Sequence, residues 1–374
     1  MIYLDHHAAT PLSEAAREAL ARAHESAWAN PASIHAAGRS ARAELELARR
    51  KLALAVQAQP ADVVFTSGGT EACNLAVLGL ASSARRVVTS GLEHPAMLAA
   101  VQALAARGAV IELLPLAVGQ PPSAAALEHA LARPAELVVL QWVNHETGSI
   151  APVQEYAALC RGRGVPLVVD ASQALGKIAC NLSELGAAAV VLTASKIGGP
   201  TGAGALLLAR AAELQPTSFG GAQERGRRAG TPDVPALAGF GAAAERLDHR
   251  LAAQAQIAAR RDRLEAACVE AGAVVNGSEG PRVATVSNLS VPGWRGEVLV
   301  AALDLEGLCA SSGAACSSGL GAPSPVLLAL YPEEPWRAES ALRLSLGPET
   351  SDDEAERAIA ILRRVLARSP TQRA

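Results

Sequence analysis

Lysine is scarce in this sequence, and the scarcity narrows the search for a reactive amine. Only three of the 33 basic residues are lysines: Lys51, Lys177 and Lys196. A reaction that needs a lysine side chain therefore has three candidates. Aromatic residues are also few, at 3% of the chain against 50% hydrophobic residues overall. The core is therefore predicted to consist mainly of Ala, Leu and Val.

Other absences argue against whole classes of protein. No apolar run reaches the roughly 18 residues that indicate a membrane span, and the N-terminus has no basic region followed by an apolar stretch. The net charge of −3 gives no electrostatic case for nucleic acid or an anionic membrane. The six cysteines contain no CxxC pair. We expect a cytoplasmic protein with reduced thiols, no bound metal, no membrane anchor and no nucleic-acid partner.

Short apolar runs alternate with helical stretches from about residue 12 to residue 245. This alternation predicts an α/β fold with a mostly parallel sheet. In such a sheet, ligands bind at the carboxyl ends of the strands. The predicted strands lie at 62–66, 86–89, 110–114, 137–141, 166–169 and 187–192, with helices at 39–56, 71–80, 95–107 and 123–132.

The last third of the chain follows a different pattern. We predict one long helix over 234–271, and after it a less regular mixture of strands and helices. Two domains are therefore expected: a large α/β domain over 12–250, and a small α+β domain over 251–374 that residues 1–11 complete. The small domain's predicted strands lie at 283–287 and 341–346, and its helices at 296–305 and 352–368.

One of the three lysines follows a predicted strand directly. Lys196 comes just after the run 187–192, and Asp170 ends the preceding run, 165–169. A carboxylate at one strand end and a lysine beyond the next is the layout of a pyridoxal-phosphate site. There the lysine forms a Schiff base, and the carboxylate keeps the pyridinium nitrogen protonated so that the ring accepts electrons.

Four further polar segments lie in the large domain, and each also has an ordinary structural explanation. The turn Ser67–Glu71 suits a phosphate at a helix N-terminus, or is a plain helix cap. His94 is a loop histidine before a helix, or an imidazole stacked on the cofactor. Asn144–Gly148 is a substrate contact or a turn. Gly220–Thr231 is a solvated basic loop, or brings Thr231 to a phosphate.

Two segments of the small domain have side chains that suit catalysis. Cys316 lies in a loop of small residues, Ser311–Ala322, whereas the other cysteines examined lie in helix or strand patterns. Exposure is a requirement for a reactive thiol, although an incidental cysteine in a flexible loop is the alternative. Arg343 interrupts an apolar strand and needs a partner, which is either a substrate carboxylate or a structural one.

Taken in order, these segments closely resemble the NifS/IscS-type cysteine desulfurases, which are pyridoxal-phosphate enzymes of fold type I in the class V aminotransferase family. The resemblance spans nearly the whole chain and implies a homodimer. It also implies a large domain with a mostly parallel, seven-stranded type of sheet and a smaller α+β C-terminal domain. The matching segments are Tyr3-Leu4-Asp5, Ala9-Thr10-Pro11, Asn30-Pro31-Ala32-Ser33 with His35 and Gly38, Ser67-Gly68-Gly69-Thr70-Glu71, Glu93-His94, Asn144-His145-Glu146, Asp170-Ala171-Ser172-Gln173, Ser195-Lys196, Gly199-Pro200, Glu224-Arg225-Gly226, Gly230-Thr231, Ser311 to Cys316 and Leu342 to Gly347.

The resemblance implies a role for each matching position. Lys196 would form the Schiff base, and Cys316 as a thiolate would attack the sulfur of L-cysteine, forming a persulfide and releasing alanine. Arg343 would bind the substrate carboxylate, with Asn144 and His145 also on the substrate side. Asp170 would pair with the pyridine nitrogen of the cofactor, Gln173 would bind the phenolic oxygen, and His94 would stack on the ring and move protons. His145 and Gly69 would also contact the cofactor. Thr70, Thr193 and Ser195 would bind the phosphate, together with Thr231 of the partner subunit.

Two positions depart from the family pattern. Ser195 stands where a histidine usually precedes the lysine, and His145 stands where a second asparagine usually follows Asn144. Both changes bear on efficiency, pH profile and substrate preference. The expected partners are L-cysteine and a sulfur-acceptor protein, in the synthesis of iron–sulfur clusters or other sulfur-containing products. Two alternatives remain: a relative acting on selenocysteine or cysteine sulfinate, and a weakly active, cofactor-binding scaffold.

Overall fold

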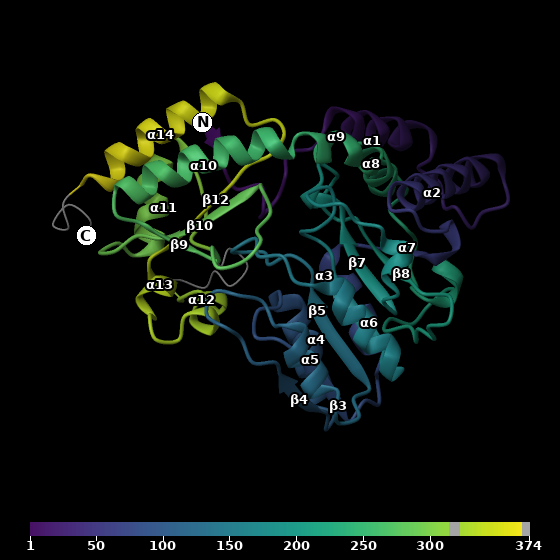
Figure 1. Ribbon diagram of the computed structural model, residues 1–374. Helices are drawn as coiled ribbons and strands as arrows, with labels where there is room; N and C mark the ends of the chain where they lie inside the picture. Colours follow the sequence, from purple (N-terminus) through teal and green to yellow (C-terminus); the bar gives the residue numbers. More distant parts are fainter. Residues whose placement is uncertain (314–321, 369–374) are drawn as a thin grey trace.

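The computed structural model describes residues 1–313 and 322–368, which form two units (Figure 1). The larger unit is built on a seven-stranded sheet. Its helices begin and end as follows: α1 Glu14–Ser26, α2 Ala36–Ala55, α3 Gly69–Leu80, α4 Pro95–Ala105, α5 Ala124–Ala130, α6 Val153–Arg163 and α7 Leu182–Leu185. The strand order is β2-β8-β7-β6-β5-β3-β4, with bounds β2 Val63–Thr66, β3 Arg86–Thr89, β4 Val110–Leu113, β5 Leu137–Gln141, β6 Leu167–Asp170, β7 Ala189–Thr193 and β8 Gly204–Leu208.

The sheet is mostly parallel, which confirms the predicted fold class. Strands β3 to β7 pair in parallel, whereas β8 runs antiparallel to both of its neighbours, β2 and β7. The antiparallel strand was not predicted. Only residues 194–203 connect β7 to β8, and a link that short returns the chain alongside itself instead of crossing over to a parallel strand.

Helices, including α8 (Val234–Ala244) from later in the chain, cover both faces of this sheet. Its strands are buried, apart from the edge strand β4 and the first residue of β3. Along β6, Leu167 and Val169 join the core beneath α1, α2, α6 and α8, whereas Val168 joins the core beneath α3 and α4. Burial on both faces explains why the strands read as continuous apolar runs instead of alternating ones. With both faces covered, the polar site residues gather at the ends of the strands.

The segment that joins the two units is three helices: α8 (Val234–Ala244), α9 (Leu247–Ala252) and α10 (Gln254–Glu270). The prediction of one helix over 234–271 is therefore wrong. Every residue of α8 is buried, and the helix packs against α1 and α2, whereas α10 packs against α14 and β10. The chain turns between these helices because each must bury its apolar side in a different core, and packing overrides helix propensity.

The smaller unit has an antiparallel sheet in the order β12-β10-β9, and α10 and α14 cover it (Figure 1). Its core includes Ile2 and Leu4, so the N-terminus belongs to this unit. The strand predicted over 283–287 lies at 286–290 instead. The backbone N–H of Val283 donates to Gly148 O of the large unit at 3.0 Å and not to a neighbouring strand of this sheet. The helices and strands of the smaller unit, besides α10, are β1 Ile2–Tyr3, β9 Val274–Asn276, β10 Val286–Ser290, α11 Gly296–Leu305, β11 Leu308–Cys309, α12 Pro325–Leu330, α13 Trp336–Glu339, β12 Ala341–Ser345 and α14 Asp352–Leu366.

Within the described residues, no helix combines the length and apolar character needed to cross a bilayer.

Candidate active site

A cavity of about 330 Å³ lies at the carboxyl ends of the strands, and residues of both units line it. Its volume falls within the range of roughly 300–1,000 Å³ typical of small-molecule sites. Of the three lysines, only Lys196 lines it. The sequence-predicted residues that line the cavity are Gly69, Thr70, His94, His145, Asp170, Gln173, Thr193, Ser195, Lys196 and Arg343.

Of the other three predicted site residues, two do not line this cavity, and the third is not among the described residues. The Asn144 side chain is buried beside it, Thr231 is an exposed residue elsewhere on the chain, and Cys316 lies outside the described residues. An exposed Thr231 away from its own cavity is compatible with the expected role in a partner subunit's site. That role, like the other individual residue roles, stays a prediction.

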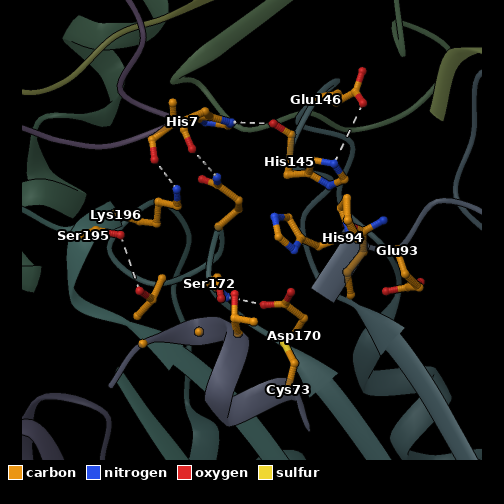
Figure 2. Close-up of a pocket in the computed structure, with 18 of the residues that line it drawn as sticks. His7, Cys73, Glu93, His94, His145, Glu146, Asp170, Ser172, Ser195 and Lys196 are labelled. Atoms are coloured by element: carbon orange, nitrogen blue, oxygen red, sulfur yellow. Dashed lines mark hydrogen bonds and ion pairs between the residues drawn. The ribbon is translucent and has the colours of Figure 1, made fainter. Parts of the chain in front are cut away.

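Lys196 is positioned by the tight turn that follows β7 and by the N-terminal segment. Ser195 O accepts hydrogen bonds from Thr10 N at 2.8 Å and from Thr10 Oγ1 at 2.9 Å. The Lys196 Nζ donates to Ala8 O. Figure 2 shows Lys196 and Asp170 around the same space. Asp170 ends β6, and Lys196 follows the neighbouring strand β7. The chain's first ten residues therefore help to aim the lysine.

Asp170 gives the cavity a buried carboxylate at the end of β6. It is 7% exposed, and its Oδ1 accepts a hydrogen bond from Ser172 N at 2.9 Å. Within residues 1–313 and 322–368 it forms no ion pair. A buried carboxylate requires a cationic or donor partner. A protonated ring nitrogen facing the cavity would supply one, so Asp170 fits the pyridine end of pyridoxal phosphate.

The turn between β2 and α3 has the chemistry of an anion site. Gly68 is the N-cap of α3 with a φ of 147°, and it has no side chain to cap the first helical N–H groups. The hydroxyls of Thr70, Thr193 and Ser195 border the same cavity. A helix N-terminus with open N–H groups binds phosphate well. The site therefore has groups suited to both ends of pyridoxal phosphate: a phosphate cradle and Asp170.

His94 caps α4 and faces the cavity with its other nitrogen. Its Nδ1 accepts a hydrogen bond from Ala96 N at 3.1 Å. Because Nδ1 is the acceptor, Nε2 carries the proton of the neutral imidazole. The His94 ring lies edge-on to His145, with ring centroids 5.1 Å apart and an interplanar angle of 72°. The histidine is thus both a helix cap and a cavity residue, and its stacking on a cofactor stays a prediction.

His145 is held uncharged by its surroundings. Burial, and then the nearby positive groups of His94, Arg343 and Lys196, lower the pKa of the imidazole well below its ordinary value. Its Nε2 lies 3.9 Å from Glu146 Oε1. Its buried Nδ1 has no hydrogen-bond partner among the residues that the structure describes. A neutral ring with an unused nitrogen can donate to or accept from a bound ligand.

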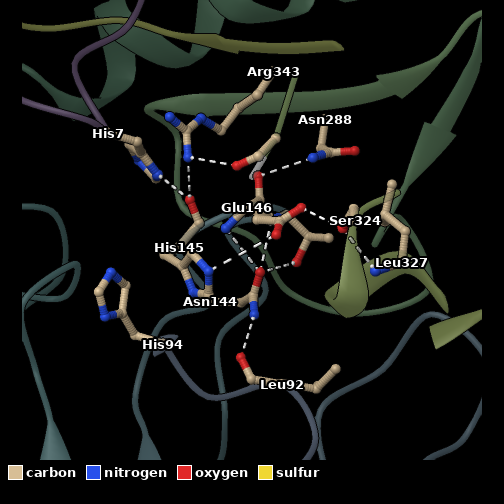
Figure 3. A network of polar contacts seen from close by, with 12 residues as sticks. His7, Leu92, His94, Asn144, His145, Glu146, Asn288, Ser324, Leu327 and Arg343 are labelled. Atoms are coloured by element: carbon tan, nitrogen blue, oxygen red, sulfur yellow. Dashed lines mark hydrogen bonds and ion pairs between the residues drawn. The ribbon is translucent and has the colours of Figure 1, made fainter. Parts of the chain in front are cut away.

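The Asn144 side chain organises the turn that presents His145 (Figure 3). Its Oδ1 accepts hydrogen bonds from Glu146 N at 2.9 Å and Thr147 N at 2.8 Å. Its Nδ2 donates to Leu92 O at 3.2 Å. Asn144 does not itself line the cavity, so in this arrangement it acts on the cavity through its neighbour.

Arg343 reaches the cavity from β12 and is 2% exposed. Its Nη2 donates to Asp5 Oδ1 at 2.8 Å, and its Nη1 donates to His145 O at 3.0 Å and Gly313 O at 3.3 Å. The Nε is buried without a hydrogen-bond partner among the described residues. The guanidinium therefore has a structural carboxylate partner and also lines the cavity, where a planar fork suits a substrate carboxylate.

Two buried glutamates at the cavity were not predicted as site residues. The Glu93 Oε1 accepts from Ser90 Oγ at 2.7 Å, and burial raises its pKa to about 8. The Glu146 Oε2 accepts from Ser324 Oγ at 2.6 Å, and burial again raises the pKa. Each glutamate adjoins a predicted residue in the sequence, His94 and His145, and that adjacency was the available signal.

The family model for class-V aminotransferases matches residues 2–358. An IscS-like cysteine desulfurase of Mycobacterium tuberculosis is 38% identical over 99% of this chain and 97% of its own length. A cysteine desulfurase of Bradyrhizobium diazoefficiens is also 38% identical, over 98% of this chain and 95% of that protein. The family resemblance drawn from the motifs is confirmed.

Solved structures agree with these relatives. A NifS-like protein superposes with a TM-score of 0.90 at 26% identity, covering 98% of this chain and 99% of that one. A structure described as SspA in complex with cysteine has a TM-score of 0.81 at 28% identity, covering 94% of this chain and all of that one. The similarity extends over both units.

Proposed function

The chain belongs to the aminotransferase class-V family, and we propose that within it the protein is a cysteine desulfurase. In the proposed reaction, the sulfur of L-cysteine is transferred to Cys316 as a persulfide and alanine is released. The observation that carries the proposal is the convergence of Lys196, Asp170 and the Ser67–Thr70 turn on one cavity. Relatives named cysteine desulfurases, at up to 38% identity over nearly the full length, support the substrate class.

The residues present fit pyridoxal phosphate as the cofactor. Lys196 would hold it covalently, Asp170 would face the pyridine nitrogen, and the α3 N-terminus with Thr70 and Thr193 would take the phosphate. When bound, the cofactor supplies an electron sink that makes the bonds at the substrate's α-carbon and β-carbon labile. The protein's task is to place the substrate and to move its protons.

The side chains around the cavity divide that task. Arg343 would orient the substrate carboxylate, because its guanidinium is fixed by Asp5 and by the carbonyl of Gly313. His94 offers Nε2 for proton transfer while its Nδ1 remains bound to the α4 backbone. An imidazole fixed at one nitrogen can exchange a proton with a substrate at the other.

Cys316 is the proposed sulfur acceptor. Its thiolate would attack the substrate sulfur and form an S–S bond as the substrate C–S bond breaks. The C–S electron pair would pass to carbon, which takes up a proton to give alanine. The nearest described residues on each side are Gly313, which borders the cavity, and Ala322, with Ser324 close behind. The chain therefore enters and leaves this segment next to the site.

The quaternary structure and partners are part of the proposal. The protein would act as a homodimer in which Thr231 of the partner subunit reaches the phosphate. It would work in the cytoplasm and pass the persulfide sulfur to an acceptor protein. Support for the dimer comes from the exposure of Thr231 away from its own cavity.

A comparison of three proteins tests this function: wild type, Cys316→Ser and Lys196→Ala. Alanine and sulfide would be measured from L-cysteine in the presence of a thiol reductant. We expect the wild type to form both products in equal amounts and both variants to form neither at an appreciable rate. Intact turnover by Cys316→Ser would rule out the persulfide route and favour a lyase acting on selenocysteine or cysteine sulfinate. A wild type that binds the cofactor without forming alanine would favour a scaffold.

A further inference from the structure

Lys177 is a buried lysine beside the cavity, and the proposed reaction has no use for it. It is 4% exposed, although lysine is rarely buried without a carboxylate partner. Within the described residues, its side chain forms no ion pair. The Nζ donates a hydrogen bond to the Oε1 of Gln173, four residues earlier. A side chain so costly to bury calls for an explanation.

The surroundings of Lys177 are basic. Burial first, and then the positive charges of Arg250, Lys196 and Arg343, lower the pKa of its amine well below the ordinary value. His6, which is also buried nearby, has its pKa lowered to about 4, mainly by burial. Among the residues that the structure describes, no acidic side chain pairs with Lys177. An amine donates hydrogen bonds in either protonation state, so donation to Gln173 persists whatever its charge.

Two contacts fix the orientation of the Gln173 amide. Its Oε1 faces the Lys177 donor, and its Nε2 donates to His7 O at 2.9 Å. A flipped amide would set its oxygen against the His7 carbonyl and lose that bond in either protonation state of Lys177, and it would set NH₂ against a protonated amine, which cannot accept. Because an NH₂ group has two protons and His7 O takes one, the second is available to the cavity that Gln173 lines.

We propose that Lys177 is a positioning residue of the cofactor site: by donating to Gln173 Oε1, it keeps the Gln173 NH₂ group directed at the phenolic oxygen of pyridoxal phosphate. The inference rests on the proposed function, because it requires that cofactor. Lys177 itself lies behind Gln173, is absent from the cavity lining and acts only through the amide. A hydrogen bond to the phenolic oxygen stabilises its anionic form and so governs the titration of the bound chromophore.

The test is a double-mutant cycle read by the visible absorbance of the bound cofactor. Lys177→Met, Gln173→Ala and the double variant would be saturated with pyridoxal phosphate and titrated with acid and base. In Lys177→Met, we expect the apparent pKa of the chromophore to rise by about one pH unit, since a hydrogen bond to a charged acceptor is worth roughly that much. In the Gln173→Ala background, the same Lys177→Met change should give no further shift.

Additivity distinguishes this role from a direct charge effect. If Lys177 acted as a buried charge, its removal would shift the titration equally in both backgrounds. An unshifted Lys177→Met titration, or an equal shift in both backgrounds, overturns the inference alone. A wild type with no visible cofactor band overturns the proposed function and this inference together. Lys51→Met is the matched control, because Lys51 pairs with Glu245 at 2.8 Å outside the site.

A second measurement does not depend on any variant folding. A high-resolution structure of the wild-type holoenzyme would show the Gln173 amide directly. We expect its nitrogen within hydrogen-bond distance of the phenolic oxygen and its Oε1 toward Lys177. A holoenzyme in which Gln173 turns its oxygen to the cofactor, or in which Lys177 contacts another group, contradicts the proposal.

Discussion

The two sides of the cavity are built in different ways. On the large-domain side, Asp170 and Lys196 stand at the ends of adjacent buried strands, where local turns place them, and Lys196 has one added long-range contact to Ala8 O. On the small-domain side, Arg343 comes from β12 and meets Asp5, 338 positions earlier in the chain. The cofactor residues thus take their positions mainly from one sheet, whereas the expected substrate clamp depends on packing between distant segments.

Two buried pairs, each a serine hydroxyl bonded to a glutamate carboxyl, show the same contrast between a short-range and a long-range contact. Ser90 and Glu93 are three residues apart within one loop, and their oxygens lie 2.7 Å apart. Glu146 and Ser324 are 178 residues apart and join the large unit to α12 at 2.6 Å. An ideal Cβ at Gly313 would also lie 2.8 Å from the Glu146 carboxylate. Glu146 therefore contacts the chain just before and just after the segment that carries Cys316.

The largest expected effects come from replacing Lys196, the proposed cofactor attachment point, and Cys316, the proposed sulfur acceptor. Lys196→Ala removes the proposed attachment point, so desulfurase activity should fall by more than about a thousandfold. Borohydride reduction followed by peptide mass spectrometry would find no cofactor adduct on this variant. Cys316→Ser should lose comparable activity yet keep a full adduct on Lys196. An undiminished adduct in Lys196→Ala would move the attachment to Lys51 or Lys177.

The next effect tests the small-domain side. Arg343→Lys keeps a positive charge near Asp5 but loses the planar fork, so kcat/KM for L-cysteine should fall by roughly a hundredfold. Most of the loss should appear in KM. Asp5→Asn, which removes the charge that orients the guanidinium, should cost about tenfold. Steady-state kinetics at saturating cofactor would measure both. An unchanged KM in Arg343→Lys would assign Arg343 a purely structural role.

Sequence reasoning was most successful where the site is local. Asp170, Lys196 and the Ser67–Thr70 turn were found because each directly follows an apolar strand, and strand ends converge in a parallel sheet. The Asp5–Arg343 pair and the Glu146–Ser324 contact could not be predicted from the chain, since nothing local specifies which distant residues meet. The break of the predicted helix 234–271 has the same origin, because it depends on where two separate cores lie.

A smaller effect concerns the pH dependence of stability. The pKa of Glu93 rises from 4.5 to about 8 on folding, so between these values the native carboxyl keeps a proton that the unfolded one has lost. Stability from this group is complete below 4.5 and is lost as the pH rises toward 8. Glutamine has no such titration. The unfolding free energy of Glu93→Gln minus that of the wild type should therefore increase by about 2 kcal/mol between pH 6 and pH 7.5. Urea unfolding at both pH values measures it. A pH-independent difference would mean that Glu93 is already ionised.

The smallest expected effect compares the two serine donors. Ser90→Ala and Ser324→Ala should each cost about 1–2 kcal/mol in unfolding free energy. Each removes a hydrogen bond to a buried carboxyl and one accepted from a backbone N–H, that of Leu92 or of Leu327. Only Ser324→Ala should loosen the contact between the units. We expect faster amide hydrogen exchange in residues 325–331 of this variant and unchanged exchange there in Ser90→Ala. Equal exchange in both variants would remove the distinction between the local and the long-range pair.

The most direct test of the account is mass spectrometry of two samples of the wild-type holoenzyme. One is alkylated after brief incubation with L-cysteine, to preserve a persulfide, and the other is reduced with borohydride without L-cysteine, to fix the cofactor. We predict a cofactor adduct on Lys196 and one additional sulfur atom on Cys316, with alanine formed in equal amount to the persulfide. Alanine formation with no sulfur on Cys316, or a cofactor adduct on another lysine, would contradict the account.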